Sequence, residues 1–208
     1  MRSKSIGAAV FLIAAAVVFC FAKPGVQAAG VVVYIQPPDS TGRLIQSSWW
    51  QPNGSDYDRY VWEDFTLPTP QAISQITWRG GYDPAKFGSG GPALSFTVAI
   101  YASISPGIQP NIMRPPLAEF KTGGNANETP AGIFAGTPMY DYSLILPSPF
   151  LASAGIKYWA QITASQNGIP DWGIASSNGG DGKYFNRFAS AGNARYQISS
   201  GGVAFTLR

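Results

Sequence analysis

The most constraining feature of this sequence is a strict alternation of apolar and polar residues in several short segments. In residues 94–102, the apolar side chains Leu94, Phe96, Val98 and Ile100 occupy every second position. A period of two indicates a β-strand with one buried and one solvated face, as in antiparallel sheets. The alternation recurs in further apolar walls, namely Phe65 and Leu67; Ile76 and Trp78; Tyr140, Tyr142, Leu144 and Leu146; Ile156, Tyr158, Ala160 and Ile162; and Val203, Phe205 and Leu207. From these walls we expect the following side chains to be buried: Phe96, Val98, Ile100, Tyr158, Ile162 and Phe205.

Glycine and proline interrupt the chain between these segments. The sequence contains 24 Gly and 17 Pro, and runs such as 88–92 and 178–182 are typical of turns. Outside the first residues no apolar stripe has helical spacing. The pattern predicts nine or ten short strands in a single domain over 29–208, folded as an all-β, two-sheet antiparallel β-sandwich of jelly-roll type. Near its start we expect a strand at 31–36 and an irregular segment ending in Trp49 and Trp50.

Residues 1–28 have the composition of a secretory signal peptide. Arg2 and Lys4 supply a positive start, an apolar run follows over 6–22, and Val26-Gln27-Ala28 offers a cleavage site of small residues. The alternative is a retained membrane anchor, for which the run is only just long enough, because a span needs about 20 apolar residues. We expect cleavage directly after this segment, a secreted protein in the extracellular space or periplasm, and no stable membrane insertion after cleavage.

The charge balance argues against a nucleic-acid partner. The formal net charge of +3 is carried by Arg2, Lys4 and Lys23, since the first 28 residues contain no acidic side chain. The rest of the chain has 11 basic and 11 acidic residues, so it lacks the excess of Lys and Arg that neutralises phosphates. The single cysteine, Cys20, lies in the predicted signal peptide, which leaves the exported domain to rely on its core instead of disulfides.

Several motifs from residue 60 onward resemble a recurrent, uncharacterised β-sandwich domain of exported bacterial proteins. The motifs that carry the resemblance are Asp64-Phe65-Thr66-Leu67, Ile76-x-Trp78-x-Gly80-Gly81-Tyr82, Phe96-x-Val98-x-Ile100-Tyr101-Ala102, Leu146-Pro147-x-Pro149-Phe150, Gly155-x-x-Tyr158-Trp159, Trp172-Gly173, Gly180-Asp181-Gly182 and Ala204-Phe205-Thr206-Leu207. Proteins of this kind often carry a C-terminal surface-sorting segment, which is absent from this sequence. The resemblance implies a fold and an exported location, and it brings no catalytic residues.

The residue inventory limits the chemistry. After residue 28 the chain has neither His nor Cys, which removes Ser-His-Asp and Cys-His machinery and ordinary zinc or copper sites. Paired carboxylates remain, as in a glycoside hydrolase. The adjacent Glu63 and Asp64 should point to opposite faces of a strand, so they cannot flank one glycosidic bond. We interpret these two and Glu119, Glu128, Asp141 and Asp171 as solvated surface or turn carboxylates, and we expect no enzyme activity.

Oxygen-bearing side chains cluster in the segment Asn53-Gly54-Ser55-Asp56-Tyr57-Asp58. Calcium binds such oxygens, so Asn53, Asp56 and Asp58 form a candidate calcium site. The segment lacks the spacing and closing Glu of an EF-hand loop, and the same residues are ordinary turn formers. We expect no metal and no cofactor, with calcium at this turn as the alternative.

Aromatic residues are the strongest indication of a binding function. Candidate ligand-binding residues are Trp49, Trp50, Tyr82, Trp159 and Trp172, which fall at strand ends or opposite an apolar wall. An exposed aromatic platform can hold a sugar ring by apolar stacking while polar neighbours fix its hydroxyls. The alternative for each ring is burial beneath a covering loop.

Three functions therefore compete. The first is a non-catalytic module that binds an extracellular glycan or surface polymer, which an exposed aromatic row would favour. The second is a structural or assembly domain of the cell envelope or matrix, which an exposed apolar patch or an unprotected edge strand would favour. The third, a carboxylate-dependent glycosidase, would need two carboxylates that converge in a cleft.

Overall fold

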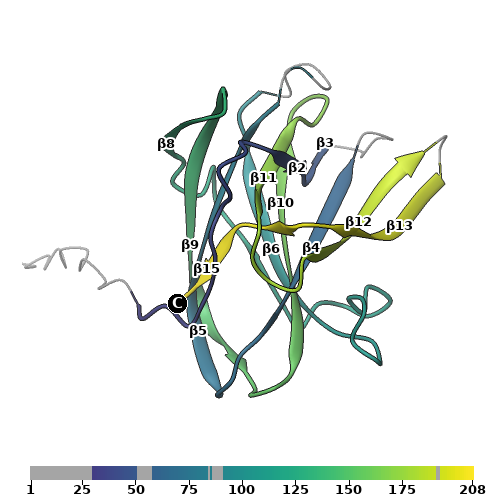
Figure 1. Ribbon diagram of the computed structural model, residues 1–208. Coiled ribbons are helices and arrows are strands. Elements are labelled where there is room, and N and C mark those ends of the chain that lie inside the picture. The colour runs from purple at the N-terminus through teal and green to yellow at the C-terminus, as the bar shows by residue number, and fades with distance from the viewer. Residues whose placement is uncertain (1–29, 51–57, 84, 86–90, 191–192) are drawn as a thin grey trace, which may run out of the picture.

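The computed structural model describes residues 30–50, 58–83, 85, 91–190 and 193–208, and Figure 1 shows their arrangement. The predicted signal peptide lies outside the described residues, as do Asn53 and Asp56 of the candidate calcium site. In the part of the chain that the structure describes, no helix is long and apolar enough to cross a membrane.

Most of the described chain lies in β-strands. In chain order the strands are β1 (Tyr34–Gln36), β2 (Leu44–Gln46), β3 (Ser48–Trp50), β4 (Arg59–Thr66), β5 (Gln71–Tyr82), β6 (Ser95–Ala102), β7 (Ala118–Lys121), β8 (Thr129–Phe134), β9 (Thr137–Ala152), β10 (Lys157–Gln166), β11 (Trp172–Ser177), β12 (Lys183–Ser190), β13 (Asn193–Ser200), β14 (Gly202–Val203) and β15 (Phe205–Leu207).

These strands form two sheets that pack face to face, which confirms the predicted all-β sandwich (Figure 1). The eight-stranded sheet is built on β5, which pairs with β9 on one side and with β15 and β11 on the other. The seven-stranded sheet has the order β13-β12-β4-β3-β10-β6-β7. Because β4 lies in one sheet and β5 in the other, the short connection between Thr66 and Gln71 links the two layers.

The strand pattern differs from the prediction in three ways. One pairing, between β3 and β10, is parallel, so the seven-stranded sheet is mixed. The described strands also outnumber the predicted nine or ten, because strands of two or three residues such as β2, β3 and β14 are too short to show alternation. The predicted N-terminal strand at 31–36 is shorter than expected and begins at Tyr34.

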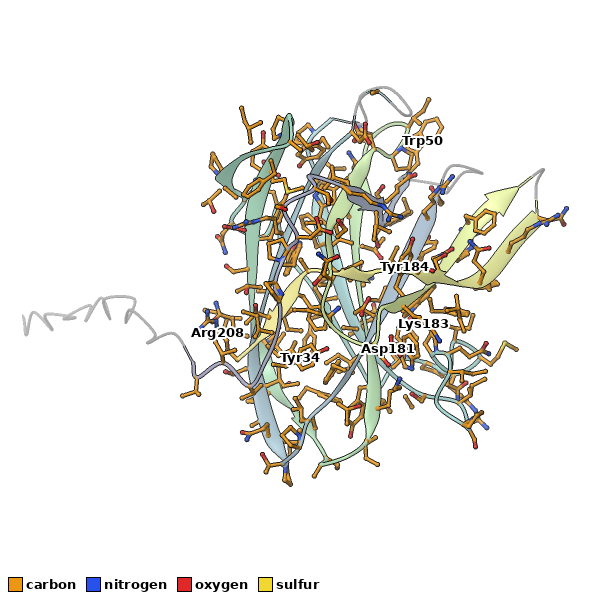
Figure 2. All side chains as sticks on the ribbon, viewed as in Figure 1. Tyr34, Trp50, Asp181, Lys183, Tyr184 and Arg208 are labelled. Atoms are coloured by element: carbon orange, nitrogen blue, oxygen red, sulfur yellow. The ribbon has the colours of Figure 1, made fainter. Side chains whose placement is uncertain are left out.

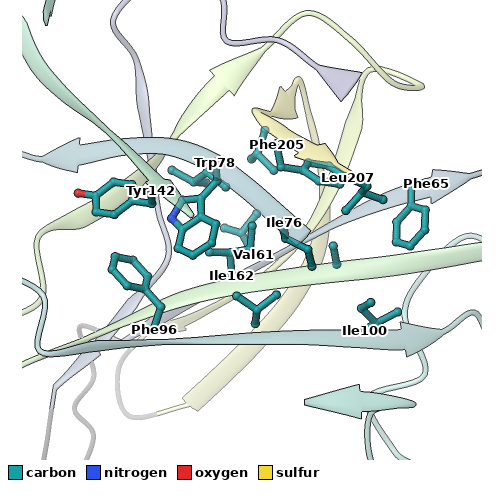
Figure 3. Packing of buried hydrophobic residues seen from close by; sticks show 14 of the residues in the cluster. Val61, Phe65, Ile76, Trp78, Phe96, Ile100, Tyr142, Ile162, Phe205 and Leu207 are labelled. Atoms are coloured by element: carbon teal, nitrogen blue, oxygen red, sulfur yellow. The ribbon is translucent and has the colours of Figure 1, made fainter. Parts of the chain in front are cut away.

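The core lies between the sheets and is rich in aromatic rings (Figure 3). Trp78 stacks on Tyr142 with ring centroids 5.7 Å apart, and Phe96 meets Tyr142 at 5.0 Å and Trp172 at 4.9 Å. Such pairs add stabilisation beyond the area that they bury. All six side chains predicted to be buried are buried: Phe96, Val98, Ile100, Tyr158, Ile162 and Phe205.

Two members of the predicted apolar walls lie outside the core. Leu94 is 45% exposed and Ile156 is 50% exposed. Each precedes the first residue of its strand, Ser95 in β6 and Lys157 in β10. In both cases the alternation of apolar residues continues one residue beyond the start of the strand.

Within the eight-stranded sheet, β5 and β11 pack closely at Gly80. A Cβ atom on Gly80 would overlap the indole of Trp172. Glycine at this position therefore lets the largest core side chain lie flat against the neighbouring strand.

Candidate ligand-binding site

The five aromatic candidates do not form a platform. Trp172 is fully buried, and its Nε1 donates to the hydroxyl of Tyr142 at 3.0 Å. Trp159 is only 4% exposed. The predicted ligand contact is therefore wrong for these two residues, because neither ring has a free face. Trp49, Trp50 and Tyr82 are half-buried, and Figure 2 shows Trp50 at one end of the sandwich.

Trp159 belongs to an aromatic cluster on the outer face of the seven-stranded sheet. The cluster is made of buried Trp62, Trp159 and Phe185, with Tyr60, Tyr101 and Ile112 packed around them. Alternation correctly placed Trp159 and Tyr101 on the face opposite the core. The segment after β6 covers this face, because Ser103 accepts a hydrogen bond from Trp159 Nε1 at 2.8 Å and Ile112 packs on the rings.

The outer face of the eight-stranded sheet carries a hollow of about 460 Å³. Its floor contains a row of hydroxyls, because Thr206 pairs with Thr77 across β15 and β5, and Thr77 pairs with Ser143 across β5 and β9. Among the residues that the structure describes, these three hydroxyls have no side-chain hydrogen bond. They are therefore available to a ligand.

A second row crosses the same floor and contains the charged groups. Arg79 donates from Nε and Nη2 to the two carboxylate oxygens of Asp141, at 2.7 and 2.9 Å. The guanidinium also lies 5.0 Å from the ring of Phe134, and Asp141 pairs with Thr129 on β8. Two parallel hydrogen bonds and a ring fix the orientation of Arg79, while the Asp141 side chain remains half exposed.

One wall of the hollow is the turn before β8. Ala126 and Asn127 both have left-handed backbone angles, with φ of 54° and 57°, and Asn127 lines the hollow. The next residue, Glu128, holds the turn in place, because it accepts hydrogen bonds from the hydroxyls of Tyr82 at 2.6 Å and Tyr142 at 2.8 Å. Tyr82, a predicted ligand contact, thus supports the wall of the hollow from inside. Asn tolerates this conformation in turns, whereas Ala126 adopts it at a cost of about 1–3 kcal/mol, which the surrounding contacts must offset.

The opposite wall contains Gln36 and Pro38. The Gln36 amide is fixed from below, since its Nε2 donates to Glu63 at 2.8 Å and its Oε1 accepts from the hydroxyl of Tyr34. Glu63 also accepts the backbone N–H of Val203 at 3.1 Å. Burial raises the pKa of Glu63 to about 8, against the opposing effect of these hydrogen bonds.

The loop that contributes Pro38 to the hollow packs against the β8–β9 hairpin. The segment between β1 and β2 contains Gly42, which has φ of +71°, and a Cβ atom there would overlap the carbonyl oxygen of Phe134. Glycine is required at this position both for its backbone angle and for the close approach to the β8–β9 hairpin.

The carboxylates do not converge on a cleft in the described part of the chain. As predicted, Glu63 and Asp64 point to opposite faces, because Glu63 bonds residues of the other sheet and Asp64 forms an ion pair with Lys157 on its own sheet. Burial raises the pKa of Asp64, and the Lys157 ammonium opposes that shift. The prediction that these acidic side chains are solvated is wrong for three of them, which are buried in hydrogen-bonded positions: Glu63, Asp64 and Asp171.

The candidate calcium turn is described only at Asp58. Its carboxylate accepts the backbone N–H of Trp50 at 2.9 Å, and the residue is 4% exposed. Within the described ranges, no three His, Cys, Asp or Glu side chains are grouped closely enough to hold a metal ion. Asp58 acts in this structure as a local support for β3.

None of the five aromatic candidates lines the hollow. Its floor is made of the polar residues that alternate with the predicted apolar walls, such as Thr77 beside Trp78 and Ser143 beside Tyr142. Alternation assigns them to the outer face, but only the pairing of β15, β5 and β9 places them in one row.

The chain matches no family model, and neither the curated proteins nor the solved structures include a match.

Proposed function

We propose that this chain is an exported, non-catalytic module that binds a neutral glycan in the hollow on the eight-stranded sheet. The observation that carries the proposal is the row of unpartnered hydroxyls formed by Thr206, Thr77 and Ser143, beside the oriented pair of Arg79 and Asp141.

The chemistry of the hollow fits a sugar. Each hydroxyl of a saccharide both donates and accepts a hydrogen bond, and the Ser, Thr and Asn side chains of the hollow can do the same. Asp141 adds an acceptor and Arg79 adds donors in a fixed fork. Because these two charges balance, the hollow offers no net attraction to an ionic ligand.

The positions of the acidic groups support a function without catalysis. A glycosidase needs two carboxyl groups about 5–9.5 Å apart on either side of the bond that it cleaves. In the hollow, Asp141 is committed to Arg79, while Glu63 lies beneath the wall and is fully buried.

The test compares two isosteric substitutions on equivalent faces. Thr77→Val removes a hydroxyl from the hollow and keeps the shape of the side chain. Thr97→Val makes the same change on β6, on the outer face of the seven-stranded sheet, where Thr97 is half-buried like Thr77. Both variants and the wild type are screened on an array of neutral oligosaccharides, and hits are titrated by calorimetry.

We expect Thr77→Val to weaken binding by about tenfold, because one hydrogen bond contributes about 0.5–1.5 kcal/mol and an unpaired ligand hydroxyl adds to the loss. Thr97→Val should bind as the wild type does. The proposal fails if no neutral glycan binds, or if the two variants bind equally. A loss confined to Trp49→Ala or Trp50→Ala would instead place the ligand at the half-buried tryptophans of β3.

A further inference from the structure

The β12–β13 hairpin extends beyond the sandwich and ends the seven-stranded sheet in a long edge strand (Figure 1). All eight residues of β13 pair with β12 on one side, and no strand of the described chain pairs with the other side. Figure 2 shows Asp181, Lys183 and Tyr184 at the base of this hairpin, from which it projects into solvent.

The edge of β13 lacks the features that keep edge strands apart. Its sequence, Asn-Ala-Arg-Tyr-Gln-Ile-Ser-Ser, contains one charge and no proline, and it exposes Tyr196 at 48% and Ile198 at 46%. The opposite edge strand of the same sheet, β7, has only four residues, two of which are the charged Glu119 and Lys121. Natural proteins use short strands and charges to block edge-to-edge pairing, and β7 follows that rule whereas β13 does not.

We propose that β13 is a self-association edge, where a second copy of this chain adds its own β13 in antiparallel orientation. A two-fold axis perpendicular to the sheet sets residues of the same face opposite each other. With the axis at Gln197, Tyr196 of each copy lies opposite Ile198 of the other, and residues 194–200 are all paired. The register follows from matching the two exposed apolar side chains of the strand.

Several properties of the chain favour a second copy as the occupant. In this register Arg195 lies opposite Ser199, so no like charges meet, and the two Gln197 amides can hydrogen-bond across the axis. The chain after residue 28 has equal numbers of basic and acidic residues, so two copies have no net repulsion.

The face that such pairing extends is already apolar. Phe185 pairs with Ile198 across β12 and β13, and the Tyr196 ring stacks on Phe185 with centroids 6.1 Å apart. Through Phe185 this strip joins the cluster of Trp62 and Trp159. Each copy would therefore place its Tyr196 and Ile198 at the margin of the other's aromatic cluster.

The association is measured by sedimentation velocity of the purified protein over a hundredfold range of concentration. A single added strand buries less surface than a standard interface, so we expect a reversible dimer with a dissociation constant on the order of micromolar. The double variant Tyr196→Lys, Ile198→Lys should raise that constant by at least about tenfold, because like charges then face one another. The matched control is Ile133→Lys, which removes a 74% exposed side chain from β8, an edge strand of the other sheet, and should remain dimeric.

A cysteine pair tests the register without disturbing the fold. In a Cys20→Ser background, Gln197→Cys places two thiols on the axis, where cross-strand Cα atoms lie about 4.5–5.5 Å apart and can form a disulfide. Ser199→Cys is the control, because its two copies lie about 13 Å apart along the strands. We expect a covalent dimer from Gln197→Cys only.

Three results would overturn the proposal: a monomer at every concentration, a dimer that persists in the double lysine variant, or cross-linking through Ser199→Cys. The proposal does not depend on the hollow, which lies on the other sheet. The double lysine variant should keep any glycan binding of the wild type, so failure of one proposal leaves the other intact.

Discussion

The outer faces of the two sheets differ in the side chains that they carry and in whether the chain covers them. On the seven-stranded sheet, large rings gather in a cluster and the chain covers them with its own segment after β6. On the eight-stranded sheet, small hydroxyls and one ion pair line a hollow that stays open. An aromatic cluster on the outer face of a sheet can therefore be a packing site for a loop of the same chain, and it need not be a ligand site. The hollow lies on the sheet opposite the one that carries the buried indoles of Trp62 and Trp159.

Truncating a side chain in the core between the two sheets should have the largest effect on stability. Phe96 is fully buried between the sheets and contacts Trp78, Tyr142 and Trp172. We expect Phe96→Ala to lower the free energy of unfolding by about 3–5 kcal/mol, measured by chemical denaturation. An unchanged midpoint would mean that the two sheets do not depend on this contact.

A substitution in the covered cluster should affect stability and leave binding unchanged. We expect Trp159→Ala to lower the free energy of unfolding by about 3 kcal/mol, because it empties the centre of the cluster and leaves Ser103 without its donor. Glycan titration of the folded variant provides the second measurement. If binding were lost while stability stayed the same, the covered face would be the ligand site and the comparison would be reversed.

The wall of the hollow should make the stability depend on pH. In the folded protein the pKa of Glu63 is raised to about 8. In the unfolded chain the pKa of this carboxyl is about 4.3. The folded state thus binds more protons in this range, so the contribution of Glu63 to the free energy of unfolding should be greatest below about pH 4 and should fall as the pH rises towards about 8, at up to about 1.4 kcal/mol per unit.

Glu63→Gln provides the control for that slope, because the amide has the same shape and does not titrate. Denaturation curves of the variant and the wild type at several pH values should differ by an amount that changes steadily between about pH 5 and pH 7. Parallel curves would show that Glu63 is already ionised in the folded protein.

The ion pair in the hollow should have the smallest effect on stability. Arg79 and Asp141 are partly exposed, with side-chain exposures of 23% and 50%, and such pairs contribute about 0–1 kcal/mol. Asp141→Asn should therefore change the midpoint of thermal unfolding little, while it weakens glycan binding because Arg79 loses its fixed orientation. A large loss of stability would identify the pair as a support of the sheet instead.

The sequence predicts the layers of this fold better than its sites. Apolar alternation identifies the core from Phe96 to Phe205 and places Trp159 on the outer face, because side-chain direction on a strand follows from residue parity alone. It cannot show that the segment carrying Ile112 folds back over Trp159. Nor can it show that Thr206, Thr77 and Ser143 become neighbours, since that depends on the register of three strands distant in the chain.

The pairing of β1 with β15 has a consequence for how the chain reaches this state. Tyr34 lies opposite Leu207, so the first strand has its partner only once the last has been made. A chain that emerges in order from its N-terminus keeps β1 without its partner, and keeps one side of residues 76–78 in β5 unpaired, until β15 has emerged. Contacts between such distant segments also slow folding, because the intervening chain must be closed into a loop before the contact forms. The eight-stranded sheet can therefore be completed only when β15 is available to pair with β1 and β5. The same strand carries Thr206 of the hollow.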